Sequence, residues 1–174
     1  EVTRLGDSAT SPQSFEAVAR ESEDWCLRWE MSPLDANTTY RYQIHRASET
    51  LWEGEDLTFR TAPKKGTPAE ITLAFGSCAN FEASSIWTRI RNERTDGMVL
   101  LGDTPYIDAT DLDRVHDAYR RFSSISTLSK TLRSIPFWGT WDDHDFGRND
   151  SDGTLPGKEH SRKGFVHYLS LIHI

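Results

Sequence analysis

The chain has 174 residues, 36% of them hydrophobic and 11% aromatic, which is enough for one ordinary domain or two small ones. Twenty Lys and Arg residues against 27 Asp and Glu residues give a formal net charge of -7, which argues against binding to nucleic acid or an anionic membrane through a basic surface. No apolar stretch of the sequence approaches the length of a membrane span.

The two ends of the sequence are unusual. The chain begins at Glu1 with neither an initiator Met nor a signal peptide, so we expect the true N-terminus to lie outside it. The last six residues, LSLIHI at 169–174, match the translation of a common sequencing adapter, and we interpret them as a scar rather than as protein. Cys26 and Cys78 are the two cysteines, and they do not form a disulfide framework.

The N-terminal third of the chain alternates apolar and polar residues with a period of two. This pattern predicts strands over DWCLRWEM (24–31), TYRYQIHR (39–46) and LTFRTAP (57–63). Short strands joined by turn-rich segments predict a small all-β sandwich over residues 1–63, followed by a linker at 64–69.

Tyr40 suggests which sandwich this is. Leu34 lies six residues before it, a spacing that resembles the tyrosine corner of fibronectin type III domains, in which the hydroxyl bonds to upstream backbone. Ala36 stands where that motif usually has a proline, and an unrelated hairpin with a core tyrosine remains the alternative.

Beyond residue 69 the pattern changes to alternating apolar strands and amphipathic helices. Strands are predicted over EITLAFGSC (70–78), GMVLLGD (97–103) and PFWGTWDDHD (136–145). Helices are predicted over 84–94 and 111–122, and TLSKTLRSI (127–135) either extends the second helix or begins another. This order predicts an α/β layer with a parallel sheet over residues 70–168.

Each predicted strand of this layer ends in chemically active residues. Because ligands bind outside the carboxyl ends of parallel strands, we expect these side chains to converge. Singly, each has an ordinary explanation, such as a buried thiol, a turn-capping aspartate, a packed ring or a solvated acidic loop. The residues concerned are Cys78, Asp103, Tyr106, Asp142, Asp143 and His144.

Together these residues favour a metal site. Thiolate, phenolate and carboxylate suit trivalent iron, whereas carboxylates and carbonyls suit calcium or magnesium, so one site could hold both kinds of ion. Asp103, at a strand tip, has two oxygens and is the natural ligand to share between two cations. A closed structural zinc site is less favoured, because paired Cys or His residues at the required spacing are missing.

Three motifs, FGSC, LGDTPY and TWDDHDFGRND, resemble those of the PhoD-like alkaline phosphatases and phosphodiesterases, a branch of the calcineurin-like metallophosphoesterase superfamily. Their order and the preceding sandwich match as well, and the resemblance extends over most of residues 15–168. It implies that residues 70–168 form the N-terminal half of a metallophosphatase domain.

The resemblance also implies roles for individual residues. Cys78, Asp103 and Tyr106 match the iron ligands of the family, with Asp103 bridging to calcium. Asp143 and His144 occupy the place of the superfamily's Asn-His pair, and Asp142 is a further candidate metal ligand. The expected cofactors are therefore Fe3+ and Ca2+, with Mg2+, Mn2+ or Zn2+ as alternatives.

The implied reaction is hydrolysis of phosphate mono- or diesters, in which a metal-activated hydroxide attacks phosphorus. His144 is then expected to protonate the leaving oxygen, with Arg148 and Asn149 as substrate contacts, although a surface arginine is the ordinary explanation of Arg148. Family members of this type act outside the cytoplasm, so the expected location is periplasmic or secreted.

Superfamily members complete their metal site with residues far downstream, and few residues follow the third motif here. His160 and His167 are expected at the surface rather than in the site. The sequence therefore predicts an unfinished sheet, an incomplete site and little activity. Two other functions stay open: an inactive adhesion or carbohydrate-associated module, and an enzyme with Cys78 as thiol nucleophile and His144 as base.

Overall fold

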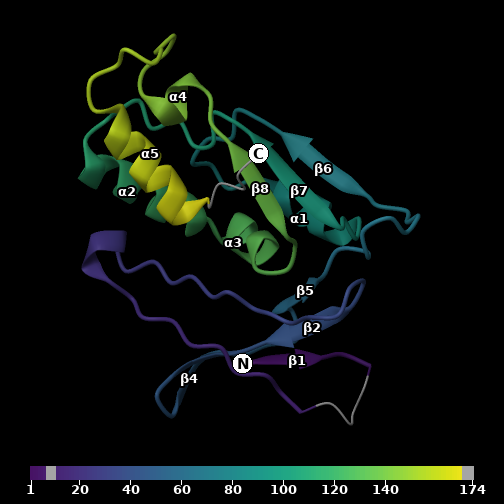
Figure 1. Cartoon of the computed structure of the whole chain (residues 1–174). Coiled ribbons are helices and arrows are strands. Elements are labelled where there is room, and N and C mark those ends of the chain that lie inside the picture. The colour runs from purple at the N-terminus through teal and green to yellow at the C-terminus, as the bar shows by residue number, and fades with distance from the viewer. Residues whose placement is uncertain (7–10, 170–174) are drawn as a thin grey trace.

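The computed structural model of the chain describes residues 1–6 and 11–169; residues 170–174 of the segment interpreted as an adapter scar lie outside this range. The chain forms a small β part from its N-terminal third and an α/β layer from the remainder, stacked against each other (Figure 1). Of the helices in the described ranges, none is both long and apolar enough to cross a membrane.

The α/β layer is built on a parallel sheet of three strands in the order β6-β7-β8. The strands are β6 (Leu73–Gly76), β7 (Gly97–Leu101) and β8 (Phe137–Thr140). The predicted parallel pairing is confirmed, although each strand is shorter than predicted. Residues 143–145, predicted as the end of the third strand, instead belong to the short helix α4 (Asp143–Phe146).

Two helices of the layer begin at residues whose side chains cap the first turn. Ser84 accepts a hydrogen bond from the amide of Ile86 at 3.2 Å, and Asp111 accepts one from the amide of Arg114 at 3.1 Å. Residues 127–135 contribute to a separate helix rather than to an extension of the preceding one. The helices are α1 (Ser85–Asn92), α2 (Leu112–Ser123), α3 (Ser126–Leu132) and α5 (Lys158–Tyr168), of which α5 was not predicted.

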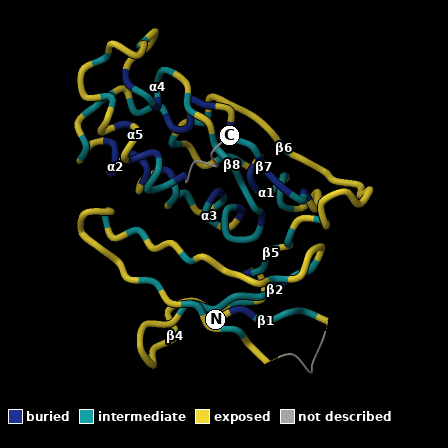
Figure 2. Tube along the Cα trace, viewed as in Figure 1, coloured by how far each residue is buried: buried dark blue, intermediate teal, exposed yellow. Residues whose placement is uncertain are grey.

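The two faces of this sheet differ strongly. Met98 and Leu100 point into the helical side, where they are 1% and 2% exposed and pack in a core with Val115, Phe122 and Phe165. The strand register places Leu73, Phe75 and Leu101 on the other face, and Phe75 is 76% exposed there. Figure 2 shows the contrast between buried β7 and exposed β6.

The N-terminal part contains two small antiparallel sheets, of order β1-β2-β5 and β3-β4. Tyr40 is 2% exposed, and its hydroxyl accepts a hydrogen bond from the amide of Asp35 at 2.9 Å, which is the backbone tie predicted for a tyrosine corner. The strands are β1 (Val2–Arg4), β2 (Thr39–Tyr42), β3 (Ile44–Arg46), β4 (Glu49–Trp52) and β5 (Thr58–Arg60).

The strand predicted over residues 24–31 is wrong. Asp24 and Trp25 both adopt left-handed backbone conformations, with φ of 49° and 60°, and form a turn after the short 3-10 helix η1 (Glu21–Glu23). The stretch that follows pairs with none of the described strands, and Trp25 is 63% exposed. Alternation alone therefore did not make a strand here, because no neighbouring strand supplies the ladder of hydrogen bonds.

Side-chain contacts hold the two parts together. Arg120 on α2 donates two hydrogen bonds from Nη1 to the Asp24 carboxylate, both at 2.8 Å. The Tyr42 hydroxyl donates to the carbonyl of Arg133 at 2.8 Å, and Arg60 pairs with Asp96 at 3.2 Å. These contacts fix the β part against the end of the layer opposite the carboxyl ends of the strands (Figure 1).

Candidate metal site at the strand ends

The carboxyl ends of the three parallel strands meet at one edge of the layer. The amide of Cys78, after β6, donates to the carbonyl of Gly102, after β7, at 3.2 Å. Gly102 has a φ of +99°, and a Cβ there would lie 2.6 Å from Cβ of Asp142, after β8. Glycine is therefore required at residue 102 by its backbone conformation and by the close approach of the third strand end.

Asp103 connects all three strand ends. One carboxylate oxygen accepts a hydrogen bond from the backbone amide of His144 at 3.3 Å, and the other lies 3.6 Å from Sγ of Cys78. The residue is 9% exposed. Both Asp103 and Cys78 have positive φ, 50° and 59°, a conformation that costs free energy in residues with a Cβ and is concentrated at functional sites.

Three of the predicted site residues could hold a cation together. Asp103, Asp143 and His144 each offer a ligand atom, and these atoms all lie within 4.8 Å of one another. Cys78 adds a thiol beside the same Asp103 carboxylate. Two carboxylates, an imidazole and a thiol from three strand ends form a donor set that fits a divalent or trivalent metal ion.

Tyr106 lies next to this group. Its ring stacks at a tilt on the ring of His144, with 4.5 Å between centroids. A hydrogen bond to the Cys78 side chain, reinforced by burial and by the Asp103 carboxylate, raises the pKa of Tyr106 to about 12. The phenol is therefore neutral at physiological pH unless a cation at the site displaces its proton.

The loop after β7 clamps His144. The amides of Ile107 and Asp108 both donate to the carbonyl of His144 at 3.0 Å, and the Asp108 carboxylate lies 2.6 Å from its Nδ1. This contact with Asp108 is the main cause of a raised pKa at His144, and the Coulombic attraction of Asp103 and Asp143 adds to it. Since Asp108 occupies Nδ1, the free ring nitrogen of His144 is Nε2.

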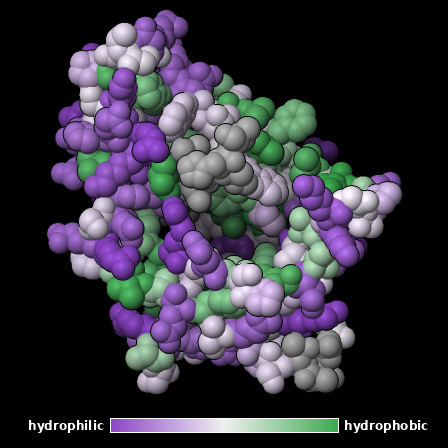
Figure 3. Space-filling view, in the orientation of Figure 1, coloured by the Kyte–Doolittle hydropathy of each residue, from purple (hydrophilic) through white to green (hydrophobic). Residues whose placement is uncertain are grey.

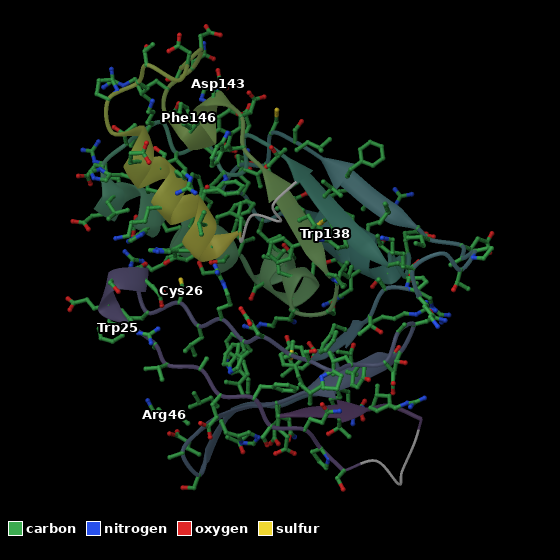
Figure 4. All side chains as sticks on the ribbon, in the orientation of Figure 1. Trp25, Cys26, Arg46, Trp138, Asp143 and Phe146 are labelled. Atoms are coloured by element: carbon green, nitrogen blue, oxygen red, sulfur yellow. The ribbon has the colours of Figure 1, made fainter. Side chains whose placement is uncertain are left out.

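The opening turn of α4 places the remaining acids. Asp143 accepts a hydrogen bond from the amide of Asp150 at 2.5 Å, which is the main reason why its pKa is lowered. The carboxylate of Asp142 instead caps α4 by accepting from the amide of Asp143 at 3.0 Å. Figure 4 shows Asp143 at this outer end of the layer.

Asp145 is the buried member of the acidic stretch. It is 1% exposed, and its two oxygens accept hydrogen bonds from the amides of Thr104 at 3.0 Å and Asp142 at 2.8 Å. Burial raises the pKa of Asp145 to about 7, although the two amide donors oppose this shift. The carboxylate thus joins the loop after β7 to the loop after β8.

The other predicted residues lie in or beyond the loop that follows α4. Arg148 and Asn149 are exposed, and the Asn149 amide donates to Asp150 at 2.6 Å. His160 is exposed as expected, whereas His167 is partly buried and its ring lies 5.4 Å from that of His116. Figure 3 shows a mainly hydrophilic surface where this loop lies.

Sequence reasoning missed Asp108 and Asp145. Asp145 had a detectable signal, since Asp142 and Asp145 have the spacing of a capping box, and this box is present in the structure. Asp108 had no such signal, because its contact with His144 depends on how the loop after β7 folds back.

The contacts of Cys78 and His144 do not support the thiol-nucleophile alternative. Cys78 Sγ is directed to Asp103 and His144 Nδ1 to Asp108, and no hydrogen bond among the described residues joins the thiol to the imidazole. A thiol nucleophile needs its base within hydrogen-bonding reach.

Comparison with known proteins gives two matches. Alkaline phosphatase D from Bacillus subtilis (strain 168) is 27% identical over 170 residues, an alignment that covers 86% of this chain and 29% of the relative. A solved structure described as the structure of PhoD aligns with a TM-score of 0.74 and 19% identity, over 88% of this chain and 35% of the other. No family model matches the sequence.

The chain thus spans about a third of the length of the relatives it matches. The structural match bears on the fold, and it fits a partial phosphoesterase-type layer. The relative found by sequence is an alkaline phosphatase, which is a type of phosphoesterase. The sequence match to alkaline phosphatase D supports the PhoD-like family, and the recognition that rested on the three strand-end motifs is confirmed.

Proposed function

We propose that this chain forms part of a metal-dependent enzyme that hydrolyses phosphate mono- or diesters at the carboxyl ends of β6, β7 and β8. The observation that carries the proposal is the convergence of Asp103, Asp143 and His144, whose side-chain polar atoms lie within 4.8 Å of one another, so that two metal-binding carboxylates and a proton donor share one site. The likeness to alkaline phosphatase D supplies the reaction class.

Cys78, Asp103 and Tyr106 would hold one ion, for which Fe3+ fits the thiol, carboxylate and phenol donors. Asp103 and Asp143, with Asp142 nearby, would hold a second and harder ion such as Ca2+, for which Mg2+, Mn2+ or Zn2+ are alternatives. When bound, such a pair of ions neutralises phosphate charge and lowers the pKa of a water molecule.

His144 is the proposed proton donor to the leaving oxygen. Asp108 fixes its ring through Nδ1 and raises its pKa, so the imidazolium form is favoured and Nε2 is left to face the substrate. Arg148 is exposed on the loop after α4, where its planar guanidinium could bind phosphate oxygens in pairs; Asn149 is its neighbour.

The inactive adhesion or carbohydrate-associated module is the weaker alternative. A module that had lost its metals would not need polar donors from three strand ends to remain together, nor two residues with side chains in left-handed conformations beside them. A fibronectin type III-like class for residues 1–63 and a periplasmic or secreted location remain part of the proposal, supported by the Tyr40 tie and by the PhoD-like family.

The test compares two histidines of the metal-loaded chain. We expect low but measurable hydrolysis of p-nitrophenyl phosphate or its bis ester with Fe3+ and Ca2+ present, and a loss of about 100-fold or more in His144→Gln. His160→Gln, which changes an exposed histidine outside the site, is the matched control and should retain activity. Equal activity in both variants would contradict the role of His144.

A further inference from the structure

Asp145 differs from the other acids of the WDDHD stretch in two ways. It is buried, and each of its carboxylate oxygens accepts a hydrogen bond from a backbone amide. Its side chain is 1% exposed, whereas Asp142 is exposed and Asp143 is half-buried. Neither oxygen of Asp145 is directed at the cluster of metal-binding candidates, since the two oxygens accept from the amides of Thr104 and Asp142. Its function must therefore be exerted through these two backbone groups.

The two amides belong to loops that carry different halves of the candidate site. Thr104 directly follows Asp103 in the loop after β7, and Asp142 directly precedes Asp143 in the loop after β8. Asp103 and Asp143 each supply one of the ligand atoms that lie within 4.8 Å of each other. One carboxylate thus sets the spacing between the loops, one residue away from each donor.

A buried carboxylate can hold two loops together strongly, but only if both of its oxygens keep their hydrogen-bond donors. Charge-assisted hydrogen bonds to amides are about twice as strong as neutral ones, and a buried carboxylate without partners is costly. Replacing one carboxylate oxygen by an NH2 group, as in Asn, would place this donor against one of the two backbone N–H donors, and that hydrogen bond would be lost. The loops would then lose their common support.

We propose that Asp145 is a positioning residue, whose buried carboxylate holds the Asp103 loop and the Asp143 loop at the separation needed to bind metal. The expected effect on metal affinity rests on the proposed function. The link between the two loops does not, because it is made by hydrogen bonds within the chain. Outer residues that orient metal ligands commonly change metal affinity by about 10–100-fold when they are replaced.

Asp145→Asn tests the link, and Asp152→Asn is the matched control. Asp152 also accepts a backbone amide, that of Thr154 at 2.8 Å, but it is exposed and lies in the loop after α4. We expect hydrogen–deuterium exchange measured by mass spectrometry to accelerate over both 102–108 and 141–146 in Asp145→Asn. Asp152→Asn should leave both segments unchanged.

Metal affinity is measured with Tb3+ alone, as a luminescent trivalent probe excited through nearby aromatic rings. The dissociation constant should rise about 10–100-fold in Asp145→Asn and stay within about twofold in Asp152→Asn. Faster exchange with unchanged Tb3+ affinity would overturn the inference, as would unchanged exchange. If the parent chain does not bind Tb3+, both the metal-dependent function and the effect of Asp145 on metal affinity are contradicted. Hydrogen–deuterium exchange still tests the link between the two loops in that case.

Asp145→Glu is the second variant in case Asp145→Asn does not fold. Glu is the usual residue at the third position of a capping box, so it preserves the contact with the amide of Asp142. Its longer side chain moves the carboxylate relative to Thr104. Exchange should therefore accelerate over 102–108 and stay slow over 141–146, and acceleration in neither segment would contradict the inference.

Discussion

The α/β layer and the N-terminal β part differ in how they are stabilised. The layer has a continuous core that includes Met98, Phe122 and Phe165, each 1% exposed. The β part buries few large side chains, among them Tyr40, and leaves others such as Trp25 exposed. The candidate site therefore lies on the better packed part, where three strands support loops whose residues adopt left-handed backbone conformations.

The largest expected effect comes from the core of the layer. Phe122 packs edge-on against Phe81 and Trp87, with ring centroids 6.5 Å and 6.4 Å apart. Phe122→Ala should lower the free energy of unfolding by about 3–5 kcal/mol, because a buried cavity is left behind. Phe75→Ala is the matched control, since Phe75 is 76% exposed and its loss should cost less than about 0.5 kcal/mol. Equal losses, measured by urea unfolding, would mean that the two faces of the sheet do not differ as described.

The next effect concerns the site itself. Gly102→Ala adds a methyl group that would lie 2.6 Å from Cβ and 2.7 Å from the amide nitrogen of Asp142, at a φ of +99°. Clash and backbone strain together should lower the free energy of unfolding by about 2–5 kcal/mol.

Gly66→Ala is the control that separates clash from strain, because Gly66 has a φ of +81° with nothing within 4 Å of the added atom. Its cost should be about 1–2 kcal/mol. Similar values for both variants, again by urea unfolding, would argue against the close approach of the strand ends.

A smaller effect is expected in the β part. Tyr40→Phe removes the hydroxyl that accepts the amide of Asp35 and leaves the ring stacked on Phe59, at 5.6 Å between centroids. The free energy of unfolding should fall by about 1 kcal/mol, the usual net value of one hydrogen bond. No change would show that water replaces the hydroxyl and that the tie does not stabilise this part.

The contact between the two parts should respond to acid. Burial lowers the pKa of His116 below its ordinary value of 6.5, an effect that Arg120 and Lys163 strengthen and that Asp24 and Asp113 oppose. Because the unfolded chain then binds the proton more readily, this contribution to stability is lost as the pH falls from about 6.5 through the folded pKa. His116→Gln should flatten this part of a stability profile, whereas His160→Gln should not. A profile with the same slope in both variants would contradict the assignment.

The parallel strands could be predicted from the sequence, because short apolar runs that alternate with amphipathic helices are typical of a buried parallel sheet. The runs 73–76, 97–101 and 137–140 form parallel strands, and the segments after their carboxyl ends bring Cys78, Asp103 and His144 together. The run at 24–31 was mispredicted, because alternation gives the period of a strand but not its neighbour. The contact between Asp108 and His144 could not be predicted either, since it joins residues 36 positions apart through the fold of a loop.

Titration of the chain with Fe3+, followed by visible absorption, tests most directly whether donors from separate strand ends meet around a cation. Coordination by Tyr106 should produce a tyrosinate-to-iron charge-transfer band in the parent chain, and Tyr106→Phe should abolish it. Tyr168→Phe, which changes the last residue of α5, whose hydroxyl donates to Asp24, should retain the band. A parent chain that stays colourless, or a band that survives Tyr106→Phe, would contradict the account.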